Sequence, residues 1–228
     1  MVQKLGLALS LPTIKQVGGA WQPSNERNLE AWYKYQTGIT LNGSDVSAWA
    51  DSSSNSFDMV QATASKQPAY NSGDIDFDAS AFQSLSSASD IIFSGVFTIG
   101  IKLFPSASNA VVLGDNTSGQ NEFFKITSTN NLRFKTDGSQ VDMGLDSGSF
   151  LADNYLVITR NSSDLVTLYF NGVAQADTET LAGTVNMDSI GVRAVNVNHY
   201  DGTISEIQMY DTESTALTAD VNTYLSNL

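Results

Sequence analysis

The sequence lacks cysteine and has only four prolines and one histidine among its 228 residues. Without cysteine, neither a disulfide framework nor a thiolate metal site can form. The single histidine, His199, does not make a zinc site alone, and no G-x-S-x-G motif supplies a nucleophile for it. No apolar run is long enough to span a membrane. These absences exclude several enzyme classes and predict no insertion into a membrane.

Positive charge is also scarce. The chain has 11 Lys and Arg against 24 Asp and Glu, which gives a net charge of −13 at pH 7. A surface of this sign repels the phosphate backbone, so we expect no nucleic-acid partner. Anionic membrane surfaces are disfavoured for the same reason. Charged residues make up only 15% of the chain, and its polar character comes largely from Ser, Thr and Asn.

Short apolar runs separated by turn residues fill most of the chain. Residues 95–105 alternate apolar with small or polar residues and end at Pro105. Residues 154–177 predict three strands, the last two joined by Asn171-Gly172, a strong hairpin signal. Residues 202–211 predict a closing strand. The pattern is typical of an all-β sandwich or jelly roll.

The last residues follow a helical pattern instead. Thr218 is the predicted N-cap, and Asp220 suits the positive end of the helix dipole. The apolar positions that fall on one helical face are Leu217, Val221, Tyr224, Leu225 and Leu228. We therefore predict one short C-terminal helix.

Residues 1–22 differ from the rest, because they contain Lys4 and Lys15 but no acidic residue. Leucines alternate with small residues, as in a strand, until Pro12. The apolar residues of this segment are Leu5, Leu7, Leu9, Leu11 and Ile14. Two interpretations remain open: a first strand of the domain's own sandwich, or an arm that adds a strand to a neighbouring subunit. We thus divide the chain into an arm, 1–22, and one sandwich domain, 23–228.

The most enzyme-like stretch is GDIDFDAS, in which Asp74, Asp76 and Asp78 occupy alternate positions. Laminarinase-type glycosidases carry paired glutamates on a strand in a similar arrangement. Retaining catalysis needs carboxyls about 5–5.5 Å apart, which the shorter aspartates reach less easily. We therefore favour a solvated strand face, assign no catalytic residue and expect the protein not to be an enzyme.

Two oxygen-rich stretches are candidates for calcium. One offers Asp51, Asn55 and Asp58, and the other offers Asp115 and Asn116. Neither matches the EF-hand, because the central glycine and the terminal glutamate are missing. We interpret both as turns, assign no metal ligand or cofactor, and leave calcium open.

The order of motifs from residue 29 onward resembles concanavalin A-like, or laminin-G-like, jelly-roll domains. The matching stretches are Trp32-Tyr33, then Trp49 to Asn55, then Phe77-Asp78. The resemblance implies a concanavalin A-like sandwich in which Trp32 and Trp49 belong to the core. It also implies that the Asp-Ser-rich stretch is a connecting turn.

The short leader before such a domain resembles small structural proteins of tailed bacteriophages. The resemblance implies a non-catalytic structural or interaction protein, a capsid decoration or a tail- or fibre-associated component. Its leucines and Ile14 would attach the arm to another copy or to a capsid or tail protein. The expected location is the virion surface, or otherwise the extracellular space.

The alternative is a lectin-like module for host-surface or extracellular glycans, which needs aromatic residues beside amides or carboxylates. The candidates are Trp21, Tyr70, Asn196, Asn198, His199, Tyr200 and Asp201. A glycoside hydrolase remains a minor alternative.

Overall fold

The structure is a computed structural model that describes residues 20–116, 122–193 and 197–228. Antiparallel strand pairs form an all-β jelly-roll sandwich with one helix near the C-terminus, which confirms the predicted fold class. Six of the predicted site residues lie outside the described residues: Leu5, Leu7, Leu9, Leu11, Ile14 and Asn196. The division into an arm and one domain stays a prediction.

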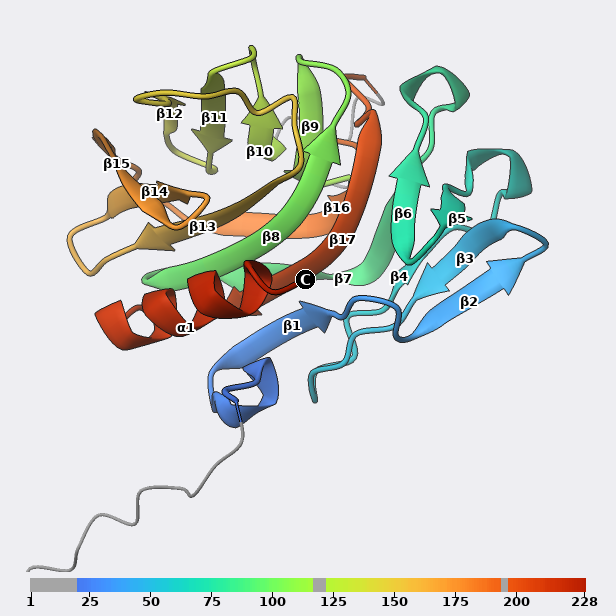
Figure 1. The fold of residues 1–228 in the computed structure, drawn as a ribbon, viewed down its shortest axis with the longest axis horizontal. Coiled ribbons are helices and arrows are strands. Elements are labelled where there is room, and N and C mark those ends of the chain that lie inside the picture. Colours follow the sequence, from blue (N-terminus) through green and yellow to red (C-terminus); the bar gives the residue numbers. More distant parts are fainter. Residues whose placement is uncertain (1–19, 117–121, 194–196) are drawn as a thin grey trace, which may run out of the picture.

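The first layer of the sandwich carries the helix. Strand β17 lies between β8 on one side and β1 and β6 on the other, and β13, β14 and β15 follow β8 outward. Figure 1 shows β8, β13 and β17 running together, with α1 alongside them. The strands are β1 (Leu29–Tyr33), β5 (Ala69–Asn71), β6 (Asp74–Phe77), β8 (Phe97–Pro105), β13 (Asn154–Arg160), β14 (Leu165–Phe170), β15 (Val173–Thr180) and β17 (Gly202–Tyr210).

In the second layer, β16 pairs with both β7 and β9. Its strands are β2 (Ile39–Asn42), β3 (Asp45–Trp49), β4 (Met59–Val60), β7 (Leu85–Phe93), β9 (Ala110–Gly114), β10 (Glu122–Ile126), β11 (Asn131–Lys135), β12 (Gln140–Gly144) and β16 (Val185–Ile190). Short 3-10 helices are η1 (Pro23–Asn25), η2 (Ala64–Lys66) and η3 (Ala79–Ala81). Strand β3 also pairs with β5 and so connects the two layers.

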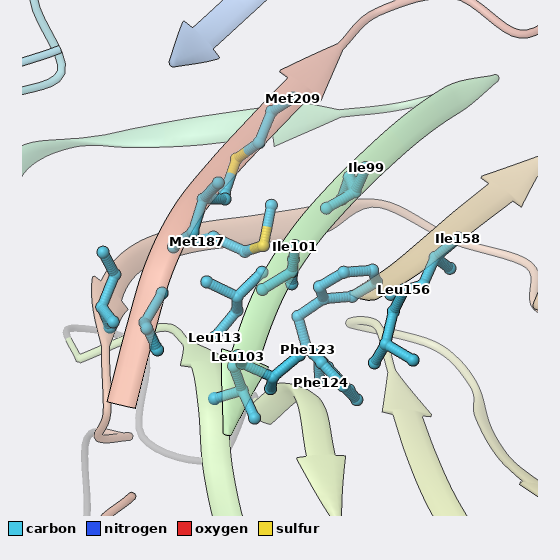
Figure 2. Close-up of a cluster of buried hydrophobic side chains, with 14 of the residues drawn as sticks. Ile99, Ile101, Leu103, Leu113, Phe123, Phe124, Leu156, Ile158, Met187 and Met209 are labelled. Atoms are coloured by element: carbon cyan, nitrogen blue, oxygen red, sulfur yellow. The ribbon is translucent and has the colours of Figure 1, made fainter. Parts of the chain in front are cut away.

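Alternation along the strands builds the core between the layers. In β8, Ile99, Ile101 and Leu103 are buried and face the opposite layer, as Figure 2 shows for the labelled residues. Leu156 and Ile158 of β13 extend this surface. The second layer contributes Leu113, Phe123, Phe124 and Met187 to the same cluster. The predicted core positions Trp32 and Trp49 are confirmed, since both side chains are buried.

The hairpin between β14 and β15 follows its sequence signal. Asn171 and Gly172 have φ angles of 48° and 82°, and two successive positive φ angles are what a type I′ turn requires. The short turn therefore sets which residues of the two strands lie opposite each other.

Helix α1 (Thr215–Leu225) covers the outer face of β8 and β13. Its buried residues Leu217, Val221 and Leu225 pack there. The predicted N-cap is wrong: Ser214 accepts the hydrogen bond from the Leu217 backbone at 3.1 Å, and Thr218 lies one turn into the helix. No helix in the described part of the chain has the length and apolar character needed to cross a membrane.

Candidate functional site

Two adjoining hollows lie near the C-terminal end of α1. The first forms where outward-facing side chains of β8 and β17 meet the loop after β1, and it encloses about 320 Å³. Its lining consists of Tyr35, Asp74, Lys102, Phe104, Asp153, Thr203, Ser205 and Leu228. Phe104 is 44% exposed although it belongs to a central strand. An aromatic ring is therefore open to a ligand at this point.

The second hollow encloses about 480 Å³ around the end of α1. Its lining consists of Ala20, Trp21, Gln22, Asp220, Thr223, Tyr224, Asn227 and Leu228. The Trp21 indole nitrogen donates to Glu26 Oε1 at 3.0 Å, and the ring meets Tyr224 edge-on with centroids 6.1 Å apart. Leu228 lines both hollows, so we treat them as one surface, the helix-end site.

Carboxylates outnumber basic groups among the charged side chains of the helix-end site. Asp74, Asp153 and Asp220 line it, whereas Lys102 is the one basic residue among the lining side chains in the described chain. Lys102 Nζ lies 3.2 Å from Asp153 Oδ1. Burial raises the pKa of Asp220, and the charge of Glu26 adds to that effect. The surface is therefore rich in hydrogen-bond acceptors and negatively charged.

A buried carboxylate, Glu206 of β17, connects the walls of the two hollows. Its Oε2 accepts from the Tyr35 backbone at 3.0 Å, and the Tyr224 hydroxyl also bonds to the carboxylate. Its Oε1 accepts from Trp32 Nε1 at 2.7 Å and Gln208 Nε2 at 2.8 Å. Burial raises the pKa of Glu206, and these hydrogen bonds oppose the rise. Glu206 thus helps to fix Tyr35 and Tyr224, which line different hollows.

Trp21 belongs to this site, but the other sequence-predicted ligand residues that the structure describes do not line it. The prediction of an exposed ring at Tyr200 is wrong, because its side chain is fully buried against Phe77. Its hydroxyl donates to the Thr203 carbonyl at 3.0 Å. His199, another predicted ligand residue, is also buried and meets the Phe82 ring edge-on. Loop-like sequence did not reveal that this segment folds back onto the core.

Among the described residues, the remaining ligand candidates Asn198, Asp201 and Tyr70 also have structural partners. Asn198 Oδ1 accepts from Lys125 Nζ at 3.3 Å, and Asp201 Oδ1 accepts from Ser106 Oγ at 2.5 Å. Tyr70 is half-buried and packs against the core. Phe104 was missed as a ligand candidate, although the alternation of residues 95–105 predicts that its aromatic side chain faces solvent.

The Asp-Ser-rich stretch is a turn held by one side chain. Asp51 Oδ1 accepts from the backbone of Trp32 at 2.9 Å and of Ser53 at 2.8 Å. Its Oδ2 accepts from the Phe57 backbone at 3.1 Å and from Ser53 Oγ at 2.6 Å. Asp58 in turn accepts from the Asp51 backbone at 2.9 Å. Both oxygens of Asp51 therefore serve the turn, as the sequence predicts.

The alternating aspartates divide between a strand and a cap. Asp74 and Asp76 belong to β6, whereas Asp78 is the N-cap of η3 and accepts from the Ser80 backbone at 2.7 Å. Bonds from the Ser80 side chain and backbone lower the pKa of Asp78. Burial raises the pKa of Asp76, with added repulsion from Asp201, Asp78 and Asp74. Asp78 therefore has a structural role as a cap.

A further cluster of carboxylates lies between β7, β9 and β16. The carboxylate oxygens of Asp90, Asp115 and Asp188 lie within 4.8 Å of one another. Asp115 and Asp188 are buried, and burial with the neighbouring charges raises the pKa of Asp188. Oxygen ligands at this spacing suit a hard cation such as calcium. The sequence singled out Asp115 with Asn116, but not Asp90 or Asp188, because their meeting depends on strand pairing.

Comparison with protein families places this fold in a known group. Residues 92–220, more than half of the chain, match the model of the concanavalin A-like lectin/glucanases superfamily. The chain belongs to this superfamily. That superfamily resemblance, expected from the sequence, is confirmed. No curated protein matches the sequence.

Solved structures share the superfamily fold at low sequence identity. The binding domain of Paraclostridial Mosquitocidal Protein 1 aligns at TM-score 0.57 and 15% identity, over 90% of this chain and 53% of that one. Domain 4 of AbnA, a GH43 extracellular arabinanase from Geobacillus stearothermophilus, was solved with arabinotriose and aligns at TM-score 0.56 and 14% identity. That alignment covers 86% of this chain and 98% of the domain.

A sialidase from Trypanosoma rangeli, in complex with the inhibitor DANA, aligns at TM-score 0.56 and 13% identity. The alignment covers 86% of this chain but 32% of the sialidase chain. The concanavalin A-like fold is thus shared with binding domains and with a domain solved with a glycan. None of these matches names a bacteriophage protein, and the virion assignment stays a prediction.

Proposed function

We propose that this superfamily member is a non-catalytic carbohydrate-binding protein that holds a glycan at the helix-end site. The observation that carries the proposal is the meeting of two hollows at Leu228, with aromatic residues and polar acceptors in both linings. Binding sites for small molecules are concave surfaces with aromatic walls and a few convergent polar groups. The helix-end site has this composition.

The side chains suit a sugar in particular. Phe104 and Tyr35 in one hollow, and Trp21 and Tyr224 in the other, offer apolar ring surface for the C–H faces of a pyranose or furanose. Tyr and Trp also keep a polar atom for hydrogen bonding. Carboxylates and the Asn227 amide lie beside these rings and can accept from sugar hydroxyls. Two hollows side by side favour an oligosaccharide over a single sugar.

The comparisons support a binding role over the structural role expected from the sequence. The AbnA domain is covered almost completely and was solved with arabinotriose. At 14% identity this likeness concerns the fold alone, so the arabinotriose suggests a ligand class to test first. Binding without catalysis is favoured because the alternating aspartates include a structural cap, Asp78.

A glycan screen followed by calorimetry tests the proposal. We expect binding of at least one oligosaccharide, and a loss of tenfold or more in affinity for Phe104→Ala or Asn227→Ala. Phe82→Ala is the matched control, because Phe82 is 49% exposed but lines neither hollow. Thermal unfolding of each variant establishes that it folds. If Phe104→Ala and Asn227→Ala still bind the glycan as the parent does, the binding site lies elsewhere on the protein. If the protein binds no glycan at all, the proposal is overturned.

A second candidate function is assembly through residues 1–22, favoured by the alternating leucines of that segment. An arm of this pattern can add a strand to another copy or to a capsid or tail protein. Location on a virion surface or outside the cell belongs to this candidate. Light scattering on the full chain and on a chain starting at Ala20 tests it. A defined oligomer that becomes a folded monomer on truncation would support it, and two monomers would exclude self-assembly through this segment.

A further inference from the structure

The charges around the helix-end site restrict which glycans can occupy it. Asp74 and Asp153 line the first hollow, and Asp220 lines the second. Glu26 accepts a 3.0 Å hydrogen bond from the Trp21 indole nitrogen. A ligand in either hollow would therefore lie beside carboxylates, which attract hydroxyl donors and repel other anions.

The basic residue of the lining is already engaged. Lys102 Nζ lies 3.2 Å from Asp153 Oδ1 and 3.3 Å from Asp153 Oδ2. Its side chain is only 14% exposed, whereas that of Asp153 is 68% exposed. The positive charge of Lys102 is thus paired with a carboxylate that is more exposed than the ammonium group. An acidic sugar in this hollow would therefore face two carboxylates, Asp74 and Asp153, and a lysine that is already paired.

From this arrangement we infer that the helix-end site selects uncharged oligosaccharides and rejects glycans that carry uronic or sialic acids. The inference rests on the proposed function and adds the ligand class. Hydroxyl groups of a neutral sugar can donate to Asp74, Asp153 and Asp220 while its apolar faces contact the aromatic rings. A sugar carboxylate in the same place has no hydroxyl-like donor to offer and adds a like charge. The protein's net charge of −13 also repels acidic glycans.

Pairs of glycans that differ in charge test the inference on the full-length protein. Suitable pairs are lactose-based oligosaccharides with and without sialic acid, cellulose oligosaccharides against carboxymethylcellulose, and methyl-esterified against free polygalacturonate. We expect the neutral member of any bound pair to bind at least tenfold more tightly at low salt. Raising the salt concentration should reduce this difference in affinity, because salt screens repulsion between exposed charges.

Charge-removing variants connect the selectivity to this site. In Asp74→Asn/Asp153→Asn, which frees Lys102 and removes two carboxylates, the acidic-to-neutral ratio of dissociation constants should fall about tenfold. Asp142→Asn is the matched control, because Asp142 forms a comparable pair with Arg133, with Nε to Oδ1 2.8 Å apart, outside both hollows. It should leave the ratio unchanged.

The outcomes separate the inference from the proposed function. Equal or tighter binding of the acidic members, or a ratio that Asp74→Asn/Asp153→Asn does not change, overturns the inference and leaves carbohydrate binding intact. Failure to bind any member of the pairs or of the wider screen overturns both.

Discussion

The indole nitrogen of Trp32 in β1 donates a 2.7 Å hydrogen bond to the buried carboxylate of Glu206 in β17. The two residues are 174 positions apart in sequence and lie on paired strands. Because burial raises the pKa of Glu206, the charged carboxylate depends on its donors. The bond therefore connects the paired strands β1 and β17 and helps to keep Glu206 charged beneath the helix-end site.

Trp32→Phe keeps an aromatic ring but removes this donor. We expect the free energy of unfolding to fall by about 2 kcal/mol at pH 8, the scale of a hydrogen bond to a charged group. The pKa of Glu206 is raised in the folded state, so its contribution to stability is present at low pH and is lost as pH rises through that value. Losing a donor raises the pKa further, so the deficit should be smaller at pH 4 in urea denaturation.

The control for this prediction is Trp32→Phe in a Glu206→Gln background. With no titrating carboxylate, the cost of the tryptophan substitution should be the same at both pH values. An equal pH dependence in both backgrounds would assign it to another group.

Gly100→Ala should destabilise the packing of α1 on β8. A Cβ at position 100 would lie 2.5 Å from Val221 Cγ1 and 3.1 Å from Leu225 Cδ1, so the Val221 side chain or the helix that carries it has to shift. Overpacking of this kind costs about 1–3 kcal/mol. Urea denaturation measures the loss, and Gly95→Ala is the control because its added Cβ meets nothing within 4 Å. Adding Val221→Ala should recover part of the stability, and no recovery would argue against the clash.

Asp51→Ala should weaken the turn that joins β3 to β4. The substitution leaves the backbone N–H groups of Trp32, Ser53 and Phe57 without their acceptor. We expect a loss of about 2 kcal/mol, within the range for unsatisfied groups of this kind. Thermal unfolding tests it, with the neighbouring Ser54→Ala as control. A loss no larger than that of the control would mean that water replaces the carboxylate without cost.

Asp188→Asn should stabilise the protein at neutral pH. The pKa of Asp188 is raised by burial and by Asp115 and Asp90, so its contribution to stability falls as pH rises through that pKa. An amide can still accept the hydrogen bond from the Asn116 backbone. We expect a Tm increase of about 2–4 °C at pH 7, the equivalent of about 1 kcal/mol for a chain of this size. The gain should shrink at pH 4.

The measurement is made in EDTA, because a bound divalent cation would offset the repulsion among the three carboxylates. Asp211→Asn at an exposed position is the control and should change Tm little. A lower Tm for Asp188→Asn in EDTA would show that the carboxylate has a stabilising contact that outweighs this repulsion.

Local sequence signals predicted elements well where they depended on neighbours along the chain. Alternation located β8, β13 and β17, and Asn171-Gly172 located the hairpin between β14 and β15. The helix was found from its apolar face, but its cap was placed at Thr218 instead of Ser214. Serine and threonine can both accept the capping hydrogen bond. Which of the two residues caps the helix depends on where its first turn lies when the helix packs against β8.

The candidate site was predicted less well. Trp21, a predicted ligand residue, lines the helix-end site, whereas the predicted ligand residues Tyr200 and His199 are buried. Their sequence, rich in Asn and Asp, is typical of a loop, but Tyr200 packs against Phe77 and His199 against Phe82. Burial of a loop depends on what packs beneath it, which local composition does not report.

Period, turn residues and charge are local properties, so many short antiparallel strands, one C-terminal helix and an acidic surface follow from the order of residues alone. The meeting of Trp21 with Tyr224 does not, nor does the way Leu228 joins their hollow to the one lined by Phe104 and Asp74. These contacts follow from strand order. Which outward-facing side chains become neighbours depends on pairings between strands far apart in sequence, and these are fixed by burial of the whole core.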